Sequence, residues 1–216
     1  MSIAEHAKNL TRDEHGVWIG PQSGAVNYPD SGNETCFQLE DASFWFRHRN
    51  DCIAAVVNRF PPEGTILDVG GGNGFVARRL LDEGYETAVM EPGPVGALNA
   101  RRQRGVPEVL CCTLEASALE ARSIAAMGFF DVLEHIEDDT ALMSQAHEAL
   151  RPGGLVYITV PAGGWLWSYS DDYARHFRRY TRSMLGELLG DGFEILYYTH
   201  LFGPLVLPVV LFRVLP

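Results

Sequence analysis

The chain has little cysteine and no excess of basic charge. Among its 216 residues there are four cysteines, none in a C-x-x-C pair or in a Cys/His set with structural-zinc spacing. They are Cys36, Cys52, Cys111 and Cys112. We interpret them as reduced thiols, which indicates a cytoplasmic protein. The net charge of −11 excludes the extended basic face that a nucleic-acid binder needs, so we expect no nucleic-acid partner.

Long apolar runs are also missing. The first fifteen residues, MSIAEHAKNLTRDEH, lack the apolar core of a signal peptide. The longest apolar run, LFGPLVLPVVLF at 201–212, is interrupted by Pro204 and Pro208 and is shorter than the ~20 residues of a membrane helix. We expect it to cover the core, to form a dimer contact in a monomer-or-homodimer protein, or, as the less favoured alternative, to touch a membrane or lipid. Because the chain stops abruptly at Pro216, we also expect the natural protein to continue.

The length fits one domain with a short appendage. Residues 1–43 are polar and rich in turns, so we predict an N-terminal cap that drapes over a main domain at 44–216. Apolar residues at helical spacing predict a helix over 44–60, ended by Pro61 and Pro62. Residues 1–43 are too broken to form a core of their own.

From residue 65 on, strand-like and helical segments alternate. The apolar runs TILDVG, YETAVM, EVLCC, SIAAMGFFDVL, LVYITV and FEILYYTHLF read as strands. The segments FVARRLLDEG, PVGALNARRQRG, DDTALMSQAHEALRPGG and RSMLGELLGDG read as helices, the third with Asp138 or Asp139 as N-cap. This alternation predicts an α/β fold with a mostly parallel sheet and helices on both faces.

A glycine-rich turn, DVGGGNG, follows the first of these strands directly. Glycine at 70, 72 and 74 allows positive φ and lets a ligand lie against the backbone, and the helix from Phe75 points its N–H groups at that ligand. The spacing is G-x-G-x-G, with Phe75 where the dinucleotide fingerprint has its third glycine. This departure disfavours a nicotinamide-dependent oxidoreductase. Glu91 ends the next strand, 19 residues after Gly72, where an acidic side chain accepts hydrogen bonds from ribose hydroxyls.

Four motifs in order, DVGGGNG, MEP, FFDVLEHIEDD and LRPGGLVYITVPA, resemble class I S-adenosylmethionine-dependent methyltransferases. The resemblance covers about residues 44–200. It is closest to small-molecule methyltransferases whose fourth strand ends in D-V-L-E-H, which include ubiquinone-type O-methyltransferases. It implies a Rossmann-like fold with a mostly parallel seven-stranded sheet, either complete or lacking part of its last strand. It also implies S-adenosyl-L-methionine as cofactor and methyl transfer to a small-molecule acceptor.

The resemblance also implies roles for single residues. The methionine part of the cofactor would lie among Asp68, Gly70, Gly71, Gly72 and Gly74. Glu91 would hold the ribose, and Pro92 would flank the adenine. CTLEAS is the nearest match to the segment that binds the adenine amine: Thr113 stands about where an Asp is common, and Leu114 and Glu115, which follow it, are the candidate contacts. Arg49, in RNDCI, would bind the cofactor carboxylate. Asp131 is also expected to contact the cofactor.

For catalysis, the D-x-x-E-H motif of Asp131, Glu134 and His135 leaves three interpretations open. His135 suits a general base. The three residues resemble the E-x-x-E-H metal site of some relatives, although one carboxylate here is Asp; we assign no metal. The third interpretation is that these side chains only shape the loop by hydrogen bonding.

A second cluster lies in WLWSYSDDYARHFRRYT, residues 165–181, where arginines and aromatic residues gather in an otherwise acidic protein. The D…RH..RY pattern recurs in the same methyltransferase group. We predict a lid that binds an anionic acceptor, with His176 as a second candidate base and Arg175, Arg178 and Tyr180 as substrate contacts. Trp45 is expected to close the pocket from the other side. The alternative interpretation of the cluster is a surface helix whose arginines pair with Asp171 and Asp172.

These observations favour O-methylation of an anionic metabolite. The alternative is a methyltransferase-like binding module that keeps the cofactor fold without catalysis.

Overall fold

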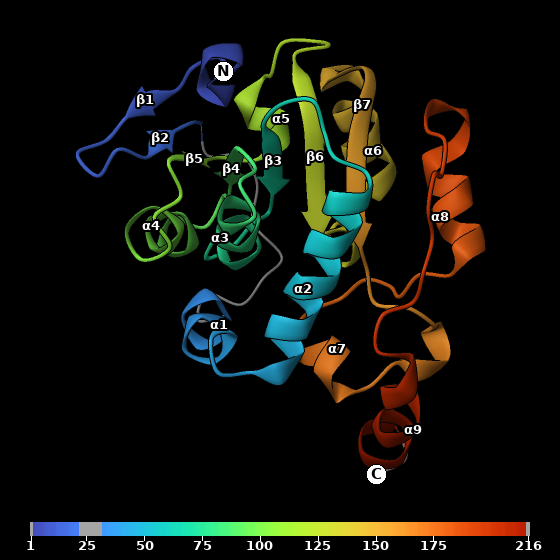
Figure 1. Cartoon of the computed structure of the whole chain (residues 1–216). Coiled ribbons are helices and arrows are strands. Elements are labelled where there is room, and N and C mark those ends of the chain that lie inside the picture. Colours follow the sequence, from blue (N-terminus) through green and yellow to red (C-terminus); the bar gives the residue numbers. More distant parts are fainter. Residues whose placement is uncertain (1, 22–31, 215–216) are drawn as a thin grey trace.

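An open sheet of seven strands forms the centre of the computed structural model, which describes residues 2–21 and 32–214 (Figure 1). The strand order is β1-β2-β5-β4-β3-β6-β7, and every pair is parallel except β1 with β2. The strands are β1 Thr11–Arg12, β2 Trp18–Ile19, β3 Ile66–Val69, β4 Thr87–Met90, β5 Glu108–Cys111, β6 Ile124–Phe130 and β7 Leu150–Thr159. The predicted α/β fold class is confirmed. The strand order reverses between β3 and β6, the position where such sheets bind ligands.

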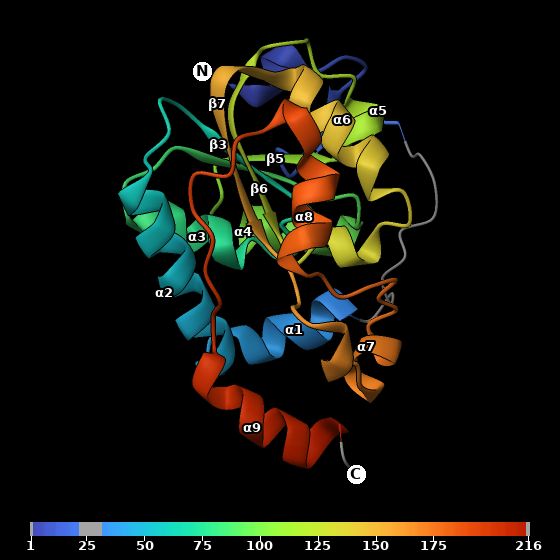
Figure 2. The ribbon, with the colours of Figure 1, turned by 90° about the vertical axis from the view of Figure 1, so that its right-hand side faces the viewer.

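Helices cover both faces of this sheet. They are α1 Gly32–Glu40, α2 Phe44–Arg59, α3 Phe75–Asp82, α4 Pro94–Arg102, α5 Leu114–Ser117, α6 Asp139–Ala149, α7 Tyr169–Tyr173, α8 Arg182–Leu189 and α9 Val206–Val209. Buried side chains of α2, α3 and α4 pack on one face, and those of α5 and α6, with α8 beside them, pack on the other. Figures 1 and 2 show α1, α7 and α9 beyond the carboxyl ends of the strands.

The alternation of side chains along each strand explains the two faces. Ile66 belongs to the cluster under α2 and α3, whereas Leu67 belongs to the cluster under α6. The adjacent Cys111 and Cys112 likewise point to opposite faces, as the strand period requires, and both thiols are free and buried. Since both faces of β3 and β4 are covered, every residue of these strands is buried.

The helices mostly match the expected ones. Residues 44–59 form α2, and the side chain of Asp138 caps α6 by accepting from the Ala141 N–H. The third predicted helix is too long, because α6 ends at Ala149 and Leu150 already begins β7. Pro152 lacks the N–H that a continued helix would need. The RPGG segment instead makes a register shift in β7 opposite Ile124 and Ala126.

Residues 2–19 extend the sheet rather than drape over a face. Trp18 pairs with Leu110 next to β5, and Val17 is buried against the helix layer. The backbone amides of Ile3 and Ala4 donate to the carboxylate of Glu108 at 3.0 and 2.8 Å. Residues 22–31, in the middle of the predicted cap, lie outside the described residues, and the domain boundary at residue 44 stays a prediction.

The expected last strand, FEILYYTHLF, is wrong. Residues 193–200 run without regular structure, and their aromatic side chains pack on helices instead of the backbone pairing with β7. Phe193 lies 5.3 Å from the His147 ring of α6, and Tyr197 lies 5.8 Å from the Phe60 ring after α2. Side-chain packing therefore outweighs strand propensity here, and β1 and β2 bring the strand count to seven.

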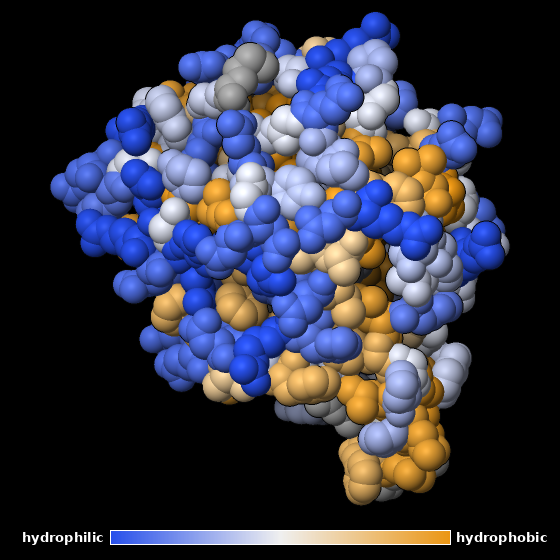
Figure 3. All heavy atoms as spheres, in the orientation of Figure 1, coloured by the Kyte–Doolittle hydropathy of each residue, from blue (hydrophilic) through white to orange (hydrophobic). Residues whose placement is uncertain are grey.

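The apolar run after residue 200 is only partly covered. Phe202 stacks on Trp45 with ring centroids 3.7 Å apart. Leu207, Leu211 and Phe212 are exposed, and Figure 3 shows apolar side chains gathered around α9. Across residues 2–21 and 32–214, none of the helices combines the length and the apolar character needed to cross a bilayer.

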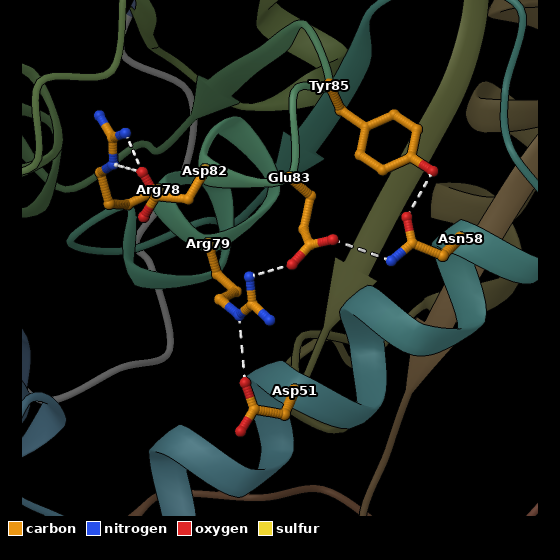
Figure 4. Close-up of polar contacts among 7 residues, drawn as sticks. All are labelled: Asp51, Asn58, Arg78, Arg79, Asp82, Glu83 and Tyr85. Atoms are coloured by element: carbon orange, nitrogen blue, oxygen red, sulfur yellow. Dashed lines mark hydrogen bonds and ion pairs between the residues drawn. The ribbon is translucent and has the colours of Figure 1, made fainter.

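A polar network on the surface joins α2 to α3 (Figure 4). Arg79 of α3 donates to Asp51 of α2 at 3.1 Å and also pairs with Glu83 one turn on. Asn58 links Glu83 at 3.0 Å to the hydroxyl of Tyr85 at 2.8 Å. These contacts orient α2, and α2 carries Trp45 and Arg49 to the site.

Candidate cofactor and acceptor site

A cavity of about 1740 Å³ opens at the carboxyl ends of the strands. Single ligands usually occupy about 300–1,000 Å³, so there is room for a cofactor and an acceptor together. Of the predicted site residues, it is lined by Trp45, Arg49, Asp68, Gly70, Gly71, Gly72, Glu91, Pro92, Asp131, His135, His176 and Tyr180. Gly74, Leu114, Glu115, Arg175 and Arg178 do not line it.

The glycine turn has the backbone that the sequence indicated. Gly70, Gly72 and Gly74 have φ of 69°, 52° and 77°. A Cβ on Gly74 would lie 2.8 Å from the Cβ of Ala100 in α4, so this glycine lets α3 and α4 approach each other and does not face the ligand. Gly72 faces the cavity. The turn therefore combines one packing glycine with glycines that leave room for a ligand.

Asp68 is a buried carboxylate without a full set of partners. Its side chain is 1% exposed, and neither carboxylate oxygen accepts a hydrogen bond of normal geometry in the described part of the chain. Burial raises the pKa of Asp68 to about 7, while Arg49 and, least of all, the Ala77 amide oppose this rise. A buried polar atom left unpaired costs free energy, which a donor from a ligand would recover. The site thus fits a group with an ammonium or N–H donor, such as the methionine end of the predicted cofactor.

Glu91 is buried too, but backbone amides fix its orientation. The Gly72 and Gly93 N–H groups donate to its two oxygens at 2.9 and 2.7 Å. Burial raises the pKa of Glu91, and these amides together with the Asn33 side chain hold it down. A carboxylate has about four acceptor positions, so Glu91 keeps capacity for ribose hydroxyls.

Arg49 and Asp131, both predicted to bind the cofactor, pair with each other. The Arg49 guanidinium donates to Asp131 at 2.7 Å, and the Thr159 hydroxyl donates to the other Asp131 oxygen at 2.9 Å. Asp131 has a φ of 57°, an uncommon conformation for a residue with a side chain. The buried Nε of Arg49 has no partner within the described residues, which suits a guanidinium that also binds a ligand carboxylate.

Glu134, His135 and His176 come together although 41 residues separate the last two in the chain. Their ligand atoms lie within 4.8 Å of one another, and the two imidazole rings are 4.7 Å apart, edge to face. Glu134 is 1% exposed, and its Oε2 has no partner in the described part of the structure. Burial, followed by the charge of Asp131, raises the pKa of Glu134 well above its usual range. The metal set considered from the sequence contained Asp131; the structure brings in His176 instead.

Asp171 orients His176. Its carboxylate accepts from His176 Nδ1 at 2.9 Å, from the Arg179 guanidinium at 2.8 and 3.0 Å, and from the Ser168 N–H at 2.8 Å. Burial alone would raise the pKa of Asp171, but these donors hold it below its usual value. With a proton on Nδ1, the neutral ring keeps its acceptor on Nε2.

The remaining predicted acceptor contacts brace the D-V-L-E-H loop or lie outside the cavity. Arg178 donates to the Ile136 carbonyl at 3.0 Å and pairs with Asp139 at 2.6 Å. The hydroxyl of Tyr180, a cavity residue, donates to Asp139 at 2.6 Å. Arg175 is exposed.

The two predicted contacts of the adenine amine do not line the cavity. Leu114 is buried in the core and Glu115 is exposed, so their contact with adenine stays a prediction.

Sequence reasoning missed Asp171, Arg179 and Asn33 as site residues. Ser168 and Asp171 form a capping box at the start of α7, a spacing that is legible in the sequence. No local signal distinguishes Arg179, which lines the cavity, from the neighbouring Arg178, which does not. Asn33 belongs to a helix that the sequence reading did not predict.

Known proteins resemble this chain in sequence. A probable S-adenosylmethionine-dependent methyltransferase of Mycolicibacterium smegmatis is 26% identical over 140 residues, covering 62% of this chain and 51% of that protein. A ubiquinone biosynthesis O-methyltransferase of Methylocella silvestris is 33% identical over 102 residues, covering 45% and 40%. The chain thus spans about half the length of these curated relatives.

Solved structures agree on the fold. The putative methyltransferase of Haloferax volcanii, solved with the Trm112 activator, has a TM-score of 0.60 at 16% identity, covering 76% of this chain and 72% of that one. Phosphoethanolamine N-methyltransferase 2 of Haemonchus contortus, solved with phosphomonomethylethanolamine and S-adenosylhomocysteine, has a TM-score of 0.58 at 20% identity, covering 78% and 44%. At these identities the likeness concerns the fold alone.

A family model of the methyltransferase domain matches residues 45–197. This match covers more than half of the chain and contains the glycine turn, Glu91 and the D-V-L-E-H loop. It confirms the resemblance and the cofactor expected from the sequence. The chain therefore belongs to the methyltransferase-domain family, and its cofactor is S-adenosylmethionine.

Proposed function

We propose that this protein O-methylates an anionic small molecule, with His176 as the general base. The observation that carries the proposal is the hydrogen bond from His176 Nδ1 to the buried carboxylate of Asp171, in the cavity that also contains Asp68 and Glu91. When bound, S-adenosylmethionine supplies an electrophilic methyl group. The residues of the chain have to hold it, position the acceptor and remove the acceptor proton.

The charges of the site support an anionic acceptor. Arg49 offsets the charge of Asp131, and a raised pKa keeps Glu134 protonated over a wider range than an exposed glutamate. Arg179 lines the cavity with its guanidinium fixed by Asp171. A carboxylate carried by the acceptor beside the hydroxyl to be methylated therefore meets donors there rather than unpaired negative charge.

The base role follows from the geometry of His176. Asp171 accepts the Nδ1 proton, fixes the ring, and stabilises the imidazolium that forms when Nε2 takes a proton from an acceptor hydroxyl. His135 packs edge-on against this ring and is the competing candidate. A hydroxyl must lose its proton on methylation, so an oriented base favours oxygen as the accepting atom.

We test the base with His176→Ala, His135→Ala and, as a matched control, His147→Ala, whose imidazole lies outside the cavity lining. His176→Ala is expected to lower kcat by about 10²–10⁴ with unchanged S-adenosylhomocysteine affinity, measured with a panel of phenols that also carry a carboxylate. An unchanged kcat would remove His176 from the mechanism, and a loss in His135→Ala alone would transfer the role. Loss of activity with a chelator, restored by a divalent cation, would favour a metal held by Glu134, His135 and His176.

The non-catalytic binding module remains the outcome to exclude. Calorimetric binding of S-adenosylhomocysteine without methyl transfer to any acceptor would favour it.

We also propose a cytoplasmic protein, monomeric or homodimeric, that binds no nucleic acid. Its net charge of −11 and the buried thiols of Cys111 and Cys112 support this proposal, and light scattering with and without RNA or DNA tests the oligomer and the partner.

A further inference from the structure

Helix α1 lies outside the region that the family model matches, yet it reaches the cofactor end of the cavity. The match begins at residue 45, whereas α1 spans Gly32–Glu40. Asn33, Cys36 and Glu40 line the cavity beside the glycine turn. Figures 1 and 2 show α1 beyond the carboxyl ends of the strands, near α4. Nothing in the family resemblance assigns a role to this helix.

The carboxamide of Asn33 lies between Glu91 and the glycine turn. It donates a hydrogen bond to the Glu91 carboxylate. Its Nδ2 is 2.7 Å from the place of a Cβ on Gly96, and its Oδ1 is 3.5 Å from that of a Cβ on Gly72. Glycine is unfavourable within a helix such as α4, and the space needed beside Asn33 and Glu91 explains why one stands at position 96.

Buried contacts hold α1 in this place. Asn73, 2% exposed within the glycine turn, donates to the Asn33 carbonyl at 2.8 Å and to Glu40 at 3.1 Å, and accepts from Asn99 at 2.9 Å. Arg104 pairs with Glu40 at 3.0 Å. The same guanidinium lies 4.9 and 4.8 Å from the ring centroids of Phe37 and Phe75.

We infer that Asn33 binds the cofactor ribose together with Glu91, and that Asn73 and Arg104 are positioning residues that hold α1 against it. A ribose diol both donates and accepts hydrogen bonds. The Glu91 carboxylate only accepts, whereas the Asn33 amide offers a donor and an acceptor beside it. Because buried contacts hold α1 in place, the Asn33 amide is already positioned beside Glu91 in the folded protein before the cofactor binds.

The test is calorimetric binding of S-adenosylhomocysteine to the full chain. Asn33→Ala is expected to bind about three- to tenfold more weakly, the loss of one or two hydrogen bonds. Gln38→Ala, an exposed amide on the same helix, should bind like the wild type. Asn33→Asp keeps the shape, places a second carboxylate beside Glu91, and should weaken binding as well. Unfolding midpoints of all variants separate weaker binding from misfolding.

Hydrogen exchange gives a second readout. S-adenosylhomocysteine should slow amide exchange of residues 33–40 in the wild type and have less effect in Asn33→Ala. Arg104→Ala should speed that exchange without ligand, because it frees α1. Wild-type affinity in both Asn33 variants would overturn the inference, and tighter binding in Asn33→Ala would mean that the amide blocks the ribose.

The inference concerns cofactor binding alone. It rests on the proposed function only in that methyl transfer is the reason for binding the cofactor. A wild-type protein that binds S-adenosylhomocysteine but methylates no acceptor would overturn the proposed function and leave the role of Asn33 intact. A fully active Asn33→Ala enzyme with unchanged affinity would do the reverse.

Discussion

Two buried aspartates, one at each half of the site, differ in how their charge is matched. Asp68, at the glycine turn, and Asp171, beside His176, are both 1% exposed. Burial raises the pKa of Asp68 to about 7, and its oxygens accept no regular hydrogen bond from the described residues. Asp171 accepts from Arg179, His176 and the Ser168 amide, and its pKa is lowered. Asp68 is therefore left for a ligand to complete, whereas the charge of Asp171 is matched within the chain.

The largest effect is expected from removing the matched carboxylate. Asp171→Ala leaves the Arg179 guanidinium and His176 without their buried partner, and should lower the free energy of unfolding by about 3–5 kcal/mol. Urea unfolding measures this loss. Asp172→Ala is the control, because that carboxylate is exposed and, among the described residues, accepts from the Trp167 indole alone. Equal effects of the two variants would contradict the buried network.

Removing the unmatched carboxylate should act in the opposite direction. Without ligand, Asp68→Asn should be more stable than the wild type at pH 8, by an amount on the order of a few kcal/mol, because it removes a buried charge. The folded pKa of about 7 lies above the unfolded value of about 3.9, so the wild type loses stability as pH rises from about 4 to about 7.

Asp68→Asn should therefore abolish this pH dependence, and the two proteins should converge near pH 4. The same variant should bind S-adenosylhomocysteine at least about tenfold more weakly, since a charged partner is lost. Urea midpoints at several pH values and calorimetry measure the two effects. A destabilised Asp68→Asn would show that the carboxylate has partners of its own.

Substitutions at single glycines should separate effects on stability from effects on cofactor binding. Gly74→Ala combines strain at positive φ with overpacking against Ala100, for a loss of about 2–4 kcal/mol. Gly84→Ala has positive φ and open space, so only about 1–2 kcal/mol is expected. Gly72→Ala should match Gly84→Ala in stability and also weaken cofactor binding. Thermal melts with and without S-adenosylhomocysteine distinguish the three.

The smallest effect on stability is expected from breaking an ion pair that is exposed to solvent. Asp82 forms an ion pair with Arg78 on the exposed face of α3 (Figure 4). Its pKa is lowered like that of Asp171, but solvent screens the pair. Arg78→Ala should change the free energy of unfolding by less than ~1 kcal/mol. A loss comparable to that of Asp171→Ala would mean that burial does not decide the strength of these pairs.

Local signals predicted much of the fold. The apolar runs of β3 to β7 and the turn at Gly70–Gly74 depend on side-chain periodicity and on backbone freedom, which neighbouring residues determine. The segment 193–202 was mispredicted because its strand propensity competes with packing of Phe193 and Tyr197 on distant helices. Residues 2–19 escaped prediction for the same reason, since the pairing partner of Trp18 is Leu110.

The α/β class, the glycine turn and the acidic residue at 91 could be predicted from the amino-acid sequence alone, because each depends on short stretches of the chain. Tertiary packing was needed to establish that Asp68 accepts no regular hydrogen bond from the described residues while Asp171 accepts several, that His176 joins Glu134 and His135, and that Asn33 reaches Glu91. Burial and long-range contacts set the charge state and the partners of a side chain. Both arise only when segments far apart in the chain pack together.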